Sequence, residues 1–315
     1  MHRVVALVQA PQSTFELACA AEVFGMSRPG LPARYAFGTC AERPGAVPTL
    51  AGYDMLVTRD LSALREADTV VIPGCPSPAP PATLDAVRQA HDRGARVVAI
   101  CSGAFLLAQA GLLDGRRATT HWRMAAELSA RHPRVLVEPD TLYVDLGDVA
   151  TSAGTAAGID LCLHLVREDH GAAHAARIAR HMVMPPHREG GQLQYAAGEP
   201  ARGGSLAPVL DWALERLHEP LTVDDLAARA ATSPRTLARR FTEQHGVGPG
   251  RWLLRQRVDA ARALLEETDL PVEAIAARVG LSSAANLRRR FHALLRTTPA
   301  AYRRAFSRGP GRGPS

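Results

Sequence analysis

The sequence lacks lysine altogether, because all 37 residues counted as lysine or arginine are arginine. Without lysine the chain has neither the phosphate-binding lysine of a P-loop nor a lysine for Schiff-base chemistry. Cysteine is also sparse: the five cysteines lie far apart, with no Cys-x-x-Cys pair. Neither a disulfide framework nor a thiolate zinc site is therefore indicated.

Long hydrophobic segments are missing as well. The longest uncharged run, residues 97–113, has 17 residues and is interrupted by serine, glycine and glutamine, whereas a membrane-spanning helix needs about 20 apolar residues. The N-terminal run VVALV is too short for the apolar region of a signal peptide. The sequence therefore predicts a cytoplasmic protein without a membrane partner.

The 315 residues, of which 46% are hydrophobic and 22% charged, suffice for two globular domains. The charge is divided unevenly between the parts of the chain. Residues 1–205 carry a net charge of −1, and residues 206–315 carry a net charge of +7. The basic character thus belongs to the C-terminal third, where arginine suits contact with a polyanion.

The N-terminal part alternates between short apolar runs and helical patterns. The predicted strands are residues 3–9, 69–72, 96–100, 135–137, 142–146 and 149–151. The first three are rich in valine, which is typical of buried parallel strands. Helices are predicted at residues 83–94 and in a long segment that ends at Gly171. This order indicates a doubly wound α/β domain over residues 1–195.

The composition changes after this domain. Residues 196–205 are rich in glycine, alanine, proline and serine, which predicts a linker. Every later segment has a helical period, so residues 206–306 are predicted to form an all-α domain. Residues 307–315 have no core-forming pattern and are predicted to be a disordered tail.

The all-α part contains an internal repeat. Residues 221–252 match residues 270–302 at an offset of 49 to 50 residues. Each copy has a short helix, a tight turn, a serine N-cap and a second helix whose leucine and phenylalanine lie four residues apart. The N-caps are Ser233 and Ser282, and the pairs are Leu237/Phe241 and Leu287/Phe291. Two helix-turn-helix units are therefore predicted.

The leucine and the phenylalanine of each second helix face the core, so the opposite side should face outward. The residues predicted there to bind DNA are Arg235, Thr236, Arg239 and Arg240 in the first unit and Asn286, Arg289 and Arg290 in the second. In the major groove arginine reads guanine and asparagine reads adenine. The alternative is an arginine-rich solvated face on an ordinary helical bundle.

Residues 206–306 resemble the AraC-type DNA-binding domain along its whole length, including the stretch RVDAARALLEETDLPVEAIAARVGLSS. The resemblance implies two recognition helices in successive major-groove faces of one DNA site. It also implies a long helix that joins them.

Cys101 stands where the run RVVAI meets CSGAFLLAQAGLL. A strand that leads through Cys-Ser-Gly into a helix is the layout of a nucleophile elbow, and the helix dipole there lowers the pKa of a thiol. The same pattern fits an inert buried cysteine, because free cysteine is among the most buried residue types. The residues alone leave both interpretations open.

Residues 1–195 resemble the PfpI-like branch of the class I glutamine amidotransferase-like superfamily. The matching segments are VVIPG, ICSGAFLLAQAGLLDGRRATTHW, TSAGTAAGIDLCLHLV and MVMPPHREGGQLQY. Together with an AraC-type domain, this is the architecture of GlxA-type transcriptional regulators. The resemblance implies a flavodoxin-like α/β sandwich that dimerises and has a ligand pocket at the C-terminal ends of its first, third and fourth strands.

The resemblance also assigns residues to that pocket. Cys101 matches the elbow cysteine and Glu16 matches the acid beside it, while Gly74 falls in the backbone-amide loop near the cysteine. Cys75 replaces the second glycine of that loop. Ser102 stands where related hydrolases carry a histidine that transfers protons, so the usual catalytic set is incomplete.

Four histidines are considered as site residues. His121, in ATTHW, is a further pocket candidate, and the alternative is a structural histidine that caps the next strand. His170, His174 and His181 lie close in sequence, but without a His-Glu-x-x-His pattern no metal site is predicted. No cofactor is expected either.

Two functions of different classes follow. The first is a sequence-specific, DNA-binding transcriptional regulator whose N-terminal domain senses a ligand without catalysis. The second is a cysteine-dependent hydro-lyase or hydrolase, similar to an isonitrile hydratase, with an appended DNA-binding domain. The expected partners are promoter or operator DNA, a small-molecule effector, a second copy of the chain in a homodimer, and RNA polymerase.

Overall fold

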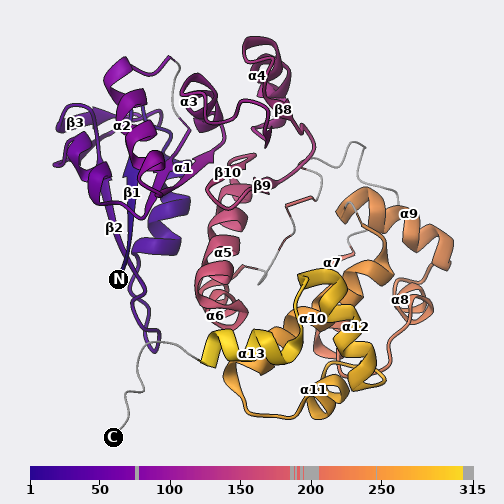
Figure 1. Ribbon diagram of the computed structural model, residues 1–315. Coiled ribbons are helices and arrows are strands. Elements are labelled where there is room, and N and C mark those ends of the chain that lie inside the picture. Colours follow the sequence, from indigo (N-terminus) through magenta and orange to yellow (C-terminus); the bar gives the residue numbers. More distant parts are fainter. Residues whose placement is uncertain are drawn as a thin grey trace, which may run out of the picture. The chain divides into compact units, whose positions relative to one another are not determined.

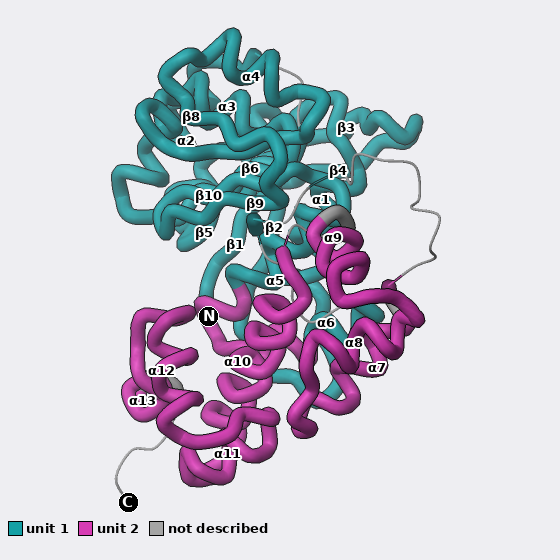
Figure 2. Tube along the Cα trace, turned by 90° about the vertical axis from the view of Figure 1, so that its right-hand side faces the viewer, with its two compact units in different colours: residues 1–165, 178–195 teal, residues 166–177, 196–315 magenta. Residues whose placement is uncertain are grey.

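The computed structural model describes residues 1–74, 78–184, 188, 190–191, 194, 206–245 and 247–307. The chain divides into two compact units (Figure 2). Unit 1 comprises Met1–Leu165 and Ile178–Tyr195, and unit 2 comprises Val166–Arg177 and Ala196–Ser315. The predicted linker lies outside the described residues, and so does the predicted tail apart from Ser307.

A six-stranded sheet in the order β2-β1-β5-β6-β10-β9 forms the centre of unit 1 (Figure 1). Its strands are β2 (Tyr35–Cys40), β1 (His2–Leu7), β5 (Thr69–Ile72), β6 (Arg96–Ile100), β10 (Val149–Ser152) and β9 (Tyr143–Asp145). Neighbouring strands are parallel except β9, which is antiparallel to β10. Smaller sheets pair β3 (Gly45–Pro48) with β4 (Asp54–Val57) and β7 (Arg117–Ala118) with β8 (Leu136–Val137).

Helices cover both faces of the large sheet. The helices of unit 1 are α1 (Thr14–Ala20), α2 (Pro81–Asp92), α3 (Gly103–Gln109), α4 (Ala125–Arg131), most of α5 (Ala156–His170) and the end of α6 (Ala172–His181). Val70 and Val97 pack on one face with side chains of α2, α3 and α4. On the other face, Gly158 of α5 lies against Ile100 and against Cys19 of α1. The five parallel strands have the flavodoxin order, which confirms the predicted α/β sandwich.

Unit 2 is helical, as predicted. Besides the residues from α5 and α6, its helices are α7 (Ala207–Glu215), α8 (Val223–Arg229), α9 (Pro234–His245), α10 (Pro249–Glu267), α11 (Val272–Arg278), α12 (Ala284–Leu295) and α13 (Pro299–Ser307). The pairs α8–α9 and α11–α12 are the two helix-turn-helix units. Phe241 lies in the core of the first and Phe291 in the core of the second. No helix among the described residues is long and apolar enough to cross a membrane.

One predicted N-cap needs correction. Ser233 accepts a hydrogen bond on its Oγ from the backbone N–H of Thr236 at 3.2 Å, as an N-cap does. In the second unit Ser283, not Ser282, accepts the equivalent bond, from the N–H of Asn286 at 3.2 Å. The first helices of the two units match at an offset of 49 residues, whereas Ser233 and Phe241 match Ser283 and Phe291 at an offset of 50. The second unit therefore has one additional residue in the turn before its N-cap.

Candidate functional site

Cys101 lies where β6 ends and the chain turns into α3. Its φ is +58°, a conformation that costs of order 1–3 kcal/mol for a residue other than glycine. The Cys101 N–H donates to the carbonyl of Ser152 at 2.9 Å, and its carbonyl accepts a hydrogen bond from the Thr120 hydroxyl at 2.9 Å. The surrounding chain thus holds the strained turn that the elbow pattern predicts.

Two glycines leave room for this turn. A Cβ on Gly103 would lie 2.2 Å from the backbone oxygen of Ile72. A Cβ on Gly154, whose φ is +82°, would lie 2.2 Å from the Cβ of Cys101 and 2.8 Å from its Sγ. The elbow is therefore enclosed by backbone on two sides, which fixes the direction of the thiol.

A cavity of about 420 Å³ opens beside the thiol. Glu16, Gly74, Cys101 and Ser102 line it together, although they come from distant parts of the sequence. They follow β1, β5 and β6, which are the first, third and fourth strands of the parallel sheet in chain order. The cavity therefore lies at the strand ends where the family resemblance implies a pocket.

Two other pocket candidates are placed differently. Cys75 lies outside the described residues. His121 is not among the residues that line the cavity; its Nδ1 accepts a hydrogen bond from the N–H of Arg123 at 3.4 Å, at the start of a short 3-10 helix. The histidine therefore caps a local helix and does not form the wall of the cavity.

The remaining walls were not found from the sequence. Leu50, Phe105 and Met124 give the cavity an apolar side, and Glu127 and Arg131 also line it. The Arg131 guanidinium is paired with Glu127 at 3.0 Å and stacks over the Phe105 ring at 5.4 Å. The four-residue spacing of Glu127 and Arg131 predicts their ion pair, but no sequence signal places that pair beside Cys101.

The electrostatic setting of Cys101 opposes ionisation. Burial, and secondly the nearby Glu16 carboxyl group, raise the pKa of the Cys101 thiol to about 12. The thiol is therefore protonated at neutral pH, and the thiolate-favouring effect expected at the elbow is outweighed. Glu16 is 6% exposed, and its buried Oε2 has no hydrogen-bond partner among the described residues. This oxygen is available to accept a hydrogen bond from a ligand.

Alkylation should report this pKa directly. We expect iodoacetamide to label Cys101 before Cys19, Cys40 and Cys162, because those three are buried and Cys101 is partly exposed. Since only the thiolate reacts, the labelling rate should rise about tenfold per pH unit between about pH 7 and pH 10. Mass spectrometry of peptides after timed labelling measures the rate. A plateau within this range would contradict the raised pKa.

The predicted DNA-binding residues lie mostly on exposed surface. On α9 and α12 the exposed residues are Arg235, Arg239, Arg289 and Arg290, and Thr236 and Asn286 are half-buried. Arg240 is only 6% exposed, so the expectation that it faces outward is wrong. It follows Leu237 by three residues and lies at the edge of the core-facing side of α9. The equivalent Arg290 in α12 is exposed.

The exposed side of α12 combines two kinds of hydrogen-bonding group. Arg289 Nη2 donates to Asn286 Oδ1 at 3.1 Å, so the guanidinium and the amide lie side by side. Arg288, which the sequence pattern did not single out, is also exposed and is paired with Glu273 at 3.1 Å. A guanidinium fork and an amide are the groups that read guanine and adenine edges.

Comparison with known proteins gives a consistent result for both units. The DJ-1/PfpI family matches residues 2–168, and a helix-turn-helix domain family matches residues 226–305. The chain is 31% identical over 261 residues to the HTH-type transcriptional regulator CdhR of Pseudomonas aeruginosa, which covers 80% of this chain and 77% of CdhR. It is 32% identical over 225 residues to the HTH-type transcriptional regulator GlxA of Rhizobium meliloti, and this match covers 69% of this chain and 68% of that regulator.

A solved structure shares the fold of the N-terminal part. The crystal structure of an AraC family transcriptional regulator from Pseudomonas putida superposes with a TM-score of 0.53 at 23% identity. The match covers 58% of this chain and all of that one. Drosophila melanogaster DJ-1beta is similar too, with a TM-score of 0.51 at 20% identity over 59% of this chain and 100% of that chain.

Proposed function

The chain belongs to the DJ-1/PfpI family and carries a helix-turn-helix domain, and from this premise we propose that it is a sequence-specific, DNA-binding transcriptional regulator of the GlxA type. The observation that carries the proposal is the repeated pair α8–α9 and α11–α12, whose second helices each present exposed arginine. Relatives over most of the chain are named transcriptional regulators. Unit 1 supplies the cavity in which a small-molecule effector is sensed.

In this proposal α9 and α12 enter the major groove. Arg235, Thr236 and Arg239 act from α9, and Asn286, Arg289 and Arg290 act from α12. The net charge of +7 in residues 206–315 supports contacts to several phosphates. Each such contact releases counterions, so the affinity should fall steeply as the salt concentration rises.

Substitution of Arg289 tests the proposal. The full chain is first used to select preferred duplexes from a random pool. Arg289→Ala should then cost about 1–3 kcal/mol at one base pair, because the guanidinium fork that reads its edge is lost. Arg289→Lys keeps the charge but not the fork, so it should weaken the base preference while retaining the salt dependence. Fluorescence anisotropy with the selected duplex and its single-base variants measures both.

A charge-matched control separates base reading from general attraction. Arg65 is an exposed arginine in unit 1, and Arg65→Ala removes the same charge. It should leave the base preference unchanged. If Arg289→Ala shows the same preference at every position as the parent chain, α12 does not read bases as proposed.

We further infer that the cavity binds its ligand without turning it over. The protonated thiol and the serine at position 102 both argue against acyl transfer. The presence of Cys101 and Glu16 in one cavity favours the alternative, a cysteine-dependent hydro-lyase or hydrolase. Multiple turnover of an isonitrile, an amide or an α-oxoaldehyde that is lost in Cys101→Ala would establish that alternative.

The proposal also includes a homodimer that acts on promoter DNA in the cytoplasm, with RNA polymerase as a further partner. Exposed apolar side chains on unit 1 support a second copy as partner, since such residues often mark association surfaces. Among them are Phe15, Tyr53 and Leu56, which are 50%, 54% and 75% exposed. Light scattering of the full chain decides between dimer and monomer.

A further inference from the structure

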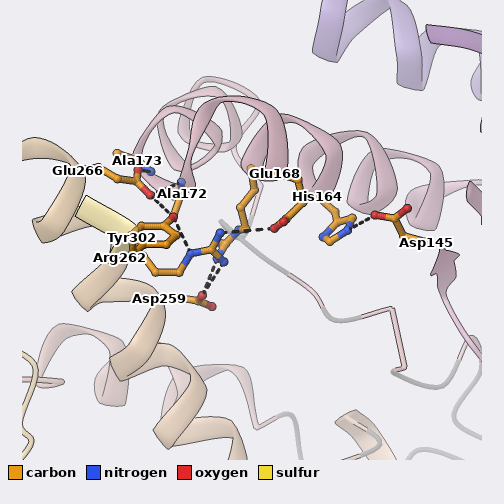
Figure 3. Close-up of polar contacts among 10 residues, drawn as sticks. Asp145, His164, Glu168, Ala172, Ala173, Asp259, Arg262, Glu266 and Tyr302 are labelled. Atoms are coloured by element: carbon orange, nitrogen blue, oxygen red, sulfur yellow. Dashed lines mark hydrogen bonds and ion pairs between the residues drawn. The ribbon is translucent and has the colours of Figure 1, made fainter. Parts of the chain in front are cut away.

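Unit 2 includes a segment that is distant in sequence from its other helices. Residues 166–177, the end of α5 and the first part of α6, belong to unit 2 by their contacts (Figure 2). In the close-up, side chains of this segment meet side chains of α10 (Figure 3). The helical unit is therefore built from two separate stretches of chain.

Charged groups join this segment to one face of α10. Arg167 Nη1 donates to Asp259 Oδ1 at 2.5 Å, and Arg262 Nη2 lies 3.5 Å from Glu168 Oε1. Asp259, Arg262 and Glu266 follow one another at intervals of three and four residues, so they share a face of the helix. Arg262 Nη1 also lies 3.7 Å from Asp259 Oδ1. Arg167 and Arg262 are 3% and 6% exposed, so removal of Asp259, which both arginines contact, leaves buried positive charge poorly compensated.

Glu266 receives the start of α6. Its Oε1 accepts from the N–H of Ala172 at 2.9 Å, and its Oε2 accepts from the N–H of Ala173 at 2.7 Å. The Tyr302 hydroxyl donates to Oε1 at 2.5 Å. Gly171 has a φ of +91°, and a Cβ there would lie 2.6 Å from Glu266 Oε2. The carboxylate satisfies N–H groups that a helix start leaves free, and a Cβ at position 171 would displace it from these groups.

The helix α10 contributes to the cores of both helix-turn-helix units. Trp252 and Leu253 lie in the first core, and Val258 and Leu265 lie in the second. Since packed interiors deform little and transmit displacement, a shift of α10 must alter the support of both recognition helices. The face of α10 that contacts residues 166–173 is thus placed to influence both recognition helices, α9 and α12.

The other end of α5 begins beside the elbow. Gly154, two residues before α5, adjoins the Cys101 side chain, and Gly158 in its first turn adjoins Cys19. Within unit 1, His164 Nε2 lies 2.8 Å from Asp145 Oδ2 of β9 (Figure 3). One continuous helix therefore starts at the wall of the elbow in unit 1 and has its last turn in unit 2.

We propose that α5 transmits the state of the Cys101 cavity to α10, with Gly171 and Glu266 as the positioning residues that fix its last turn to the DNA-binding unit. This coupling rests on the proposed function. A group that fills the cavity presses on the Cys101 side chain, which in turn adjoins Gly154 just before α5. If α5 shifts, residues 166–173 move with it. They are bonded to Asp259, Arg262 and Glu266, so the displacement reaches α10.

The probe for the test is the carboxamidomethyl group that iodoacetamide places on Cys101. The full chain carries Cys75→Ser, and mass spectrometry confirms a single label. Anisotropy with the selected duplex then gives the affinity before and after labelling. Labelling should change Kd by about tenfold in this parent chain. In Glu266→Ala and in Gly171→Ala the change should fall below about twofold, because the link to α10 is broken.

Two controls match these substitutions. Glu267→Ala removes a carboxylate from the next, exposed position of α10. Gly147→Ala adds a methyl group at a φ of +92° with nothing within 4 Å. Both should retain the full response of the parent. An equal response in Glu266→Ala and Gly171→Ala would overturn the proposal, and so would a parent chain whose DNA affinity ignores the label.

Hydrogen exchange distinguishes this proposal from the proposed function. Labelling of Cys101 should change the exchange rates of the amides in residues 166–177, and iodoacetamide should have no such effect on Cys101→Ala. This readout needs no DNA. A chain that shows the exchange response but binds no duplex contradicts the proposed function alone. A chain that binds duplex, but in which labelling changes neither the Kd nor the exchange rates, contradicts the coupling alone.

Discussion

Phe291→Ala should destabilise the second helix-turn-helix unit by about 3–5 kcal/mol, the usual loss for a large aromatic side chain removed from a core. Phe291 is fully buried and meets the Tyr302 ring edge-on at a centroid distance of 5.4 Å. Its core includes Val258 and Leu265 of α10 but not Phe241, which packs in the first core. The loss should therefore be concentrated in α11, α12 and α13.

Native-state hydrogen exchange measures this loss element by element. Amides of α11 and α12 should lose protection in Phe291→Ala, while those of α8 and α9 should retain most of theirs. Phe291→Leu keeps a branched apolar side chain in place and leaves a smaller cavity, so it should cost less than Phe291→Ala. Uniform loss of protection in α8 and α12 would show that the two cores unfold as one.

The parts of the fold that the sequence predicts are those with a strong local pattern. β5 and β6 are buried on both faces, so they appear as unbroken apolar runs such as TVVI. The helix-turn-helix repeat is visible because Leu237 and Phe241 must recur four residues apart to reach one core. In contrast, β2 reads YAFGTC and is half-exposed at the edge of the sheet, so it has no valine run to reveal it.

The site is predictable only in part, because proximity in space leaves no trace in local spacing. The elbow at Cys101 is visible since its strand, turn and helix are consecutive. Of its apolar walls, Phe105 belongs to the helix of the elbow itself, but Leu50 lies far from the cysteine in sequence. Likewise Glu266 meets the N–H of Ala172 across 94 residues. Neither contact is encoded by a period of two or of 3.6 residues.

Gly154→Ala should destabilise unit 1 by about 2–4 kcal/mol, which combines the strain of a left-handed residue with overpacking against the elbow. The added Cβ would lie 2.2 Å from the Cβ of Cys101, and neither atom belongs to a flexible chain end. Because the elbow is held by Ser152 and Thr120, it cannot retreat without losing hydrogen bonds. Denaturant unfolding, followed by hydrogen exchange in β6 and β10, measures the change.

Two further variants separate the clash from the backbone strain. Gly115 has a φ of +70° with nothing within 4 Å of its added Cβ, so Gly115→Ala carries the strain alone and should cost about 1 kcal/mol. In a Cys101→Gly background the Cβ that Gly154→Ala meets is gone, so the cost of Gly154→Ala should fall towards the same value. If the cost is equal in both backgrounds, the glycine serves only its own backbone conformation. A reduced cost identifies the Cys101 side chain as what requires glycine at position 154, and thus ties the start of α5 to the thiol.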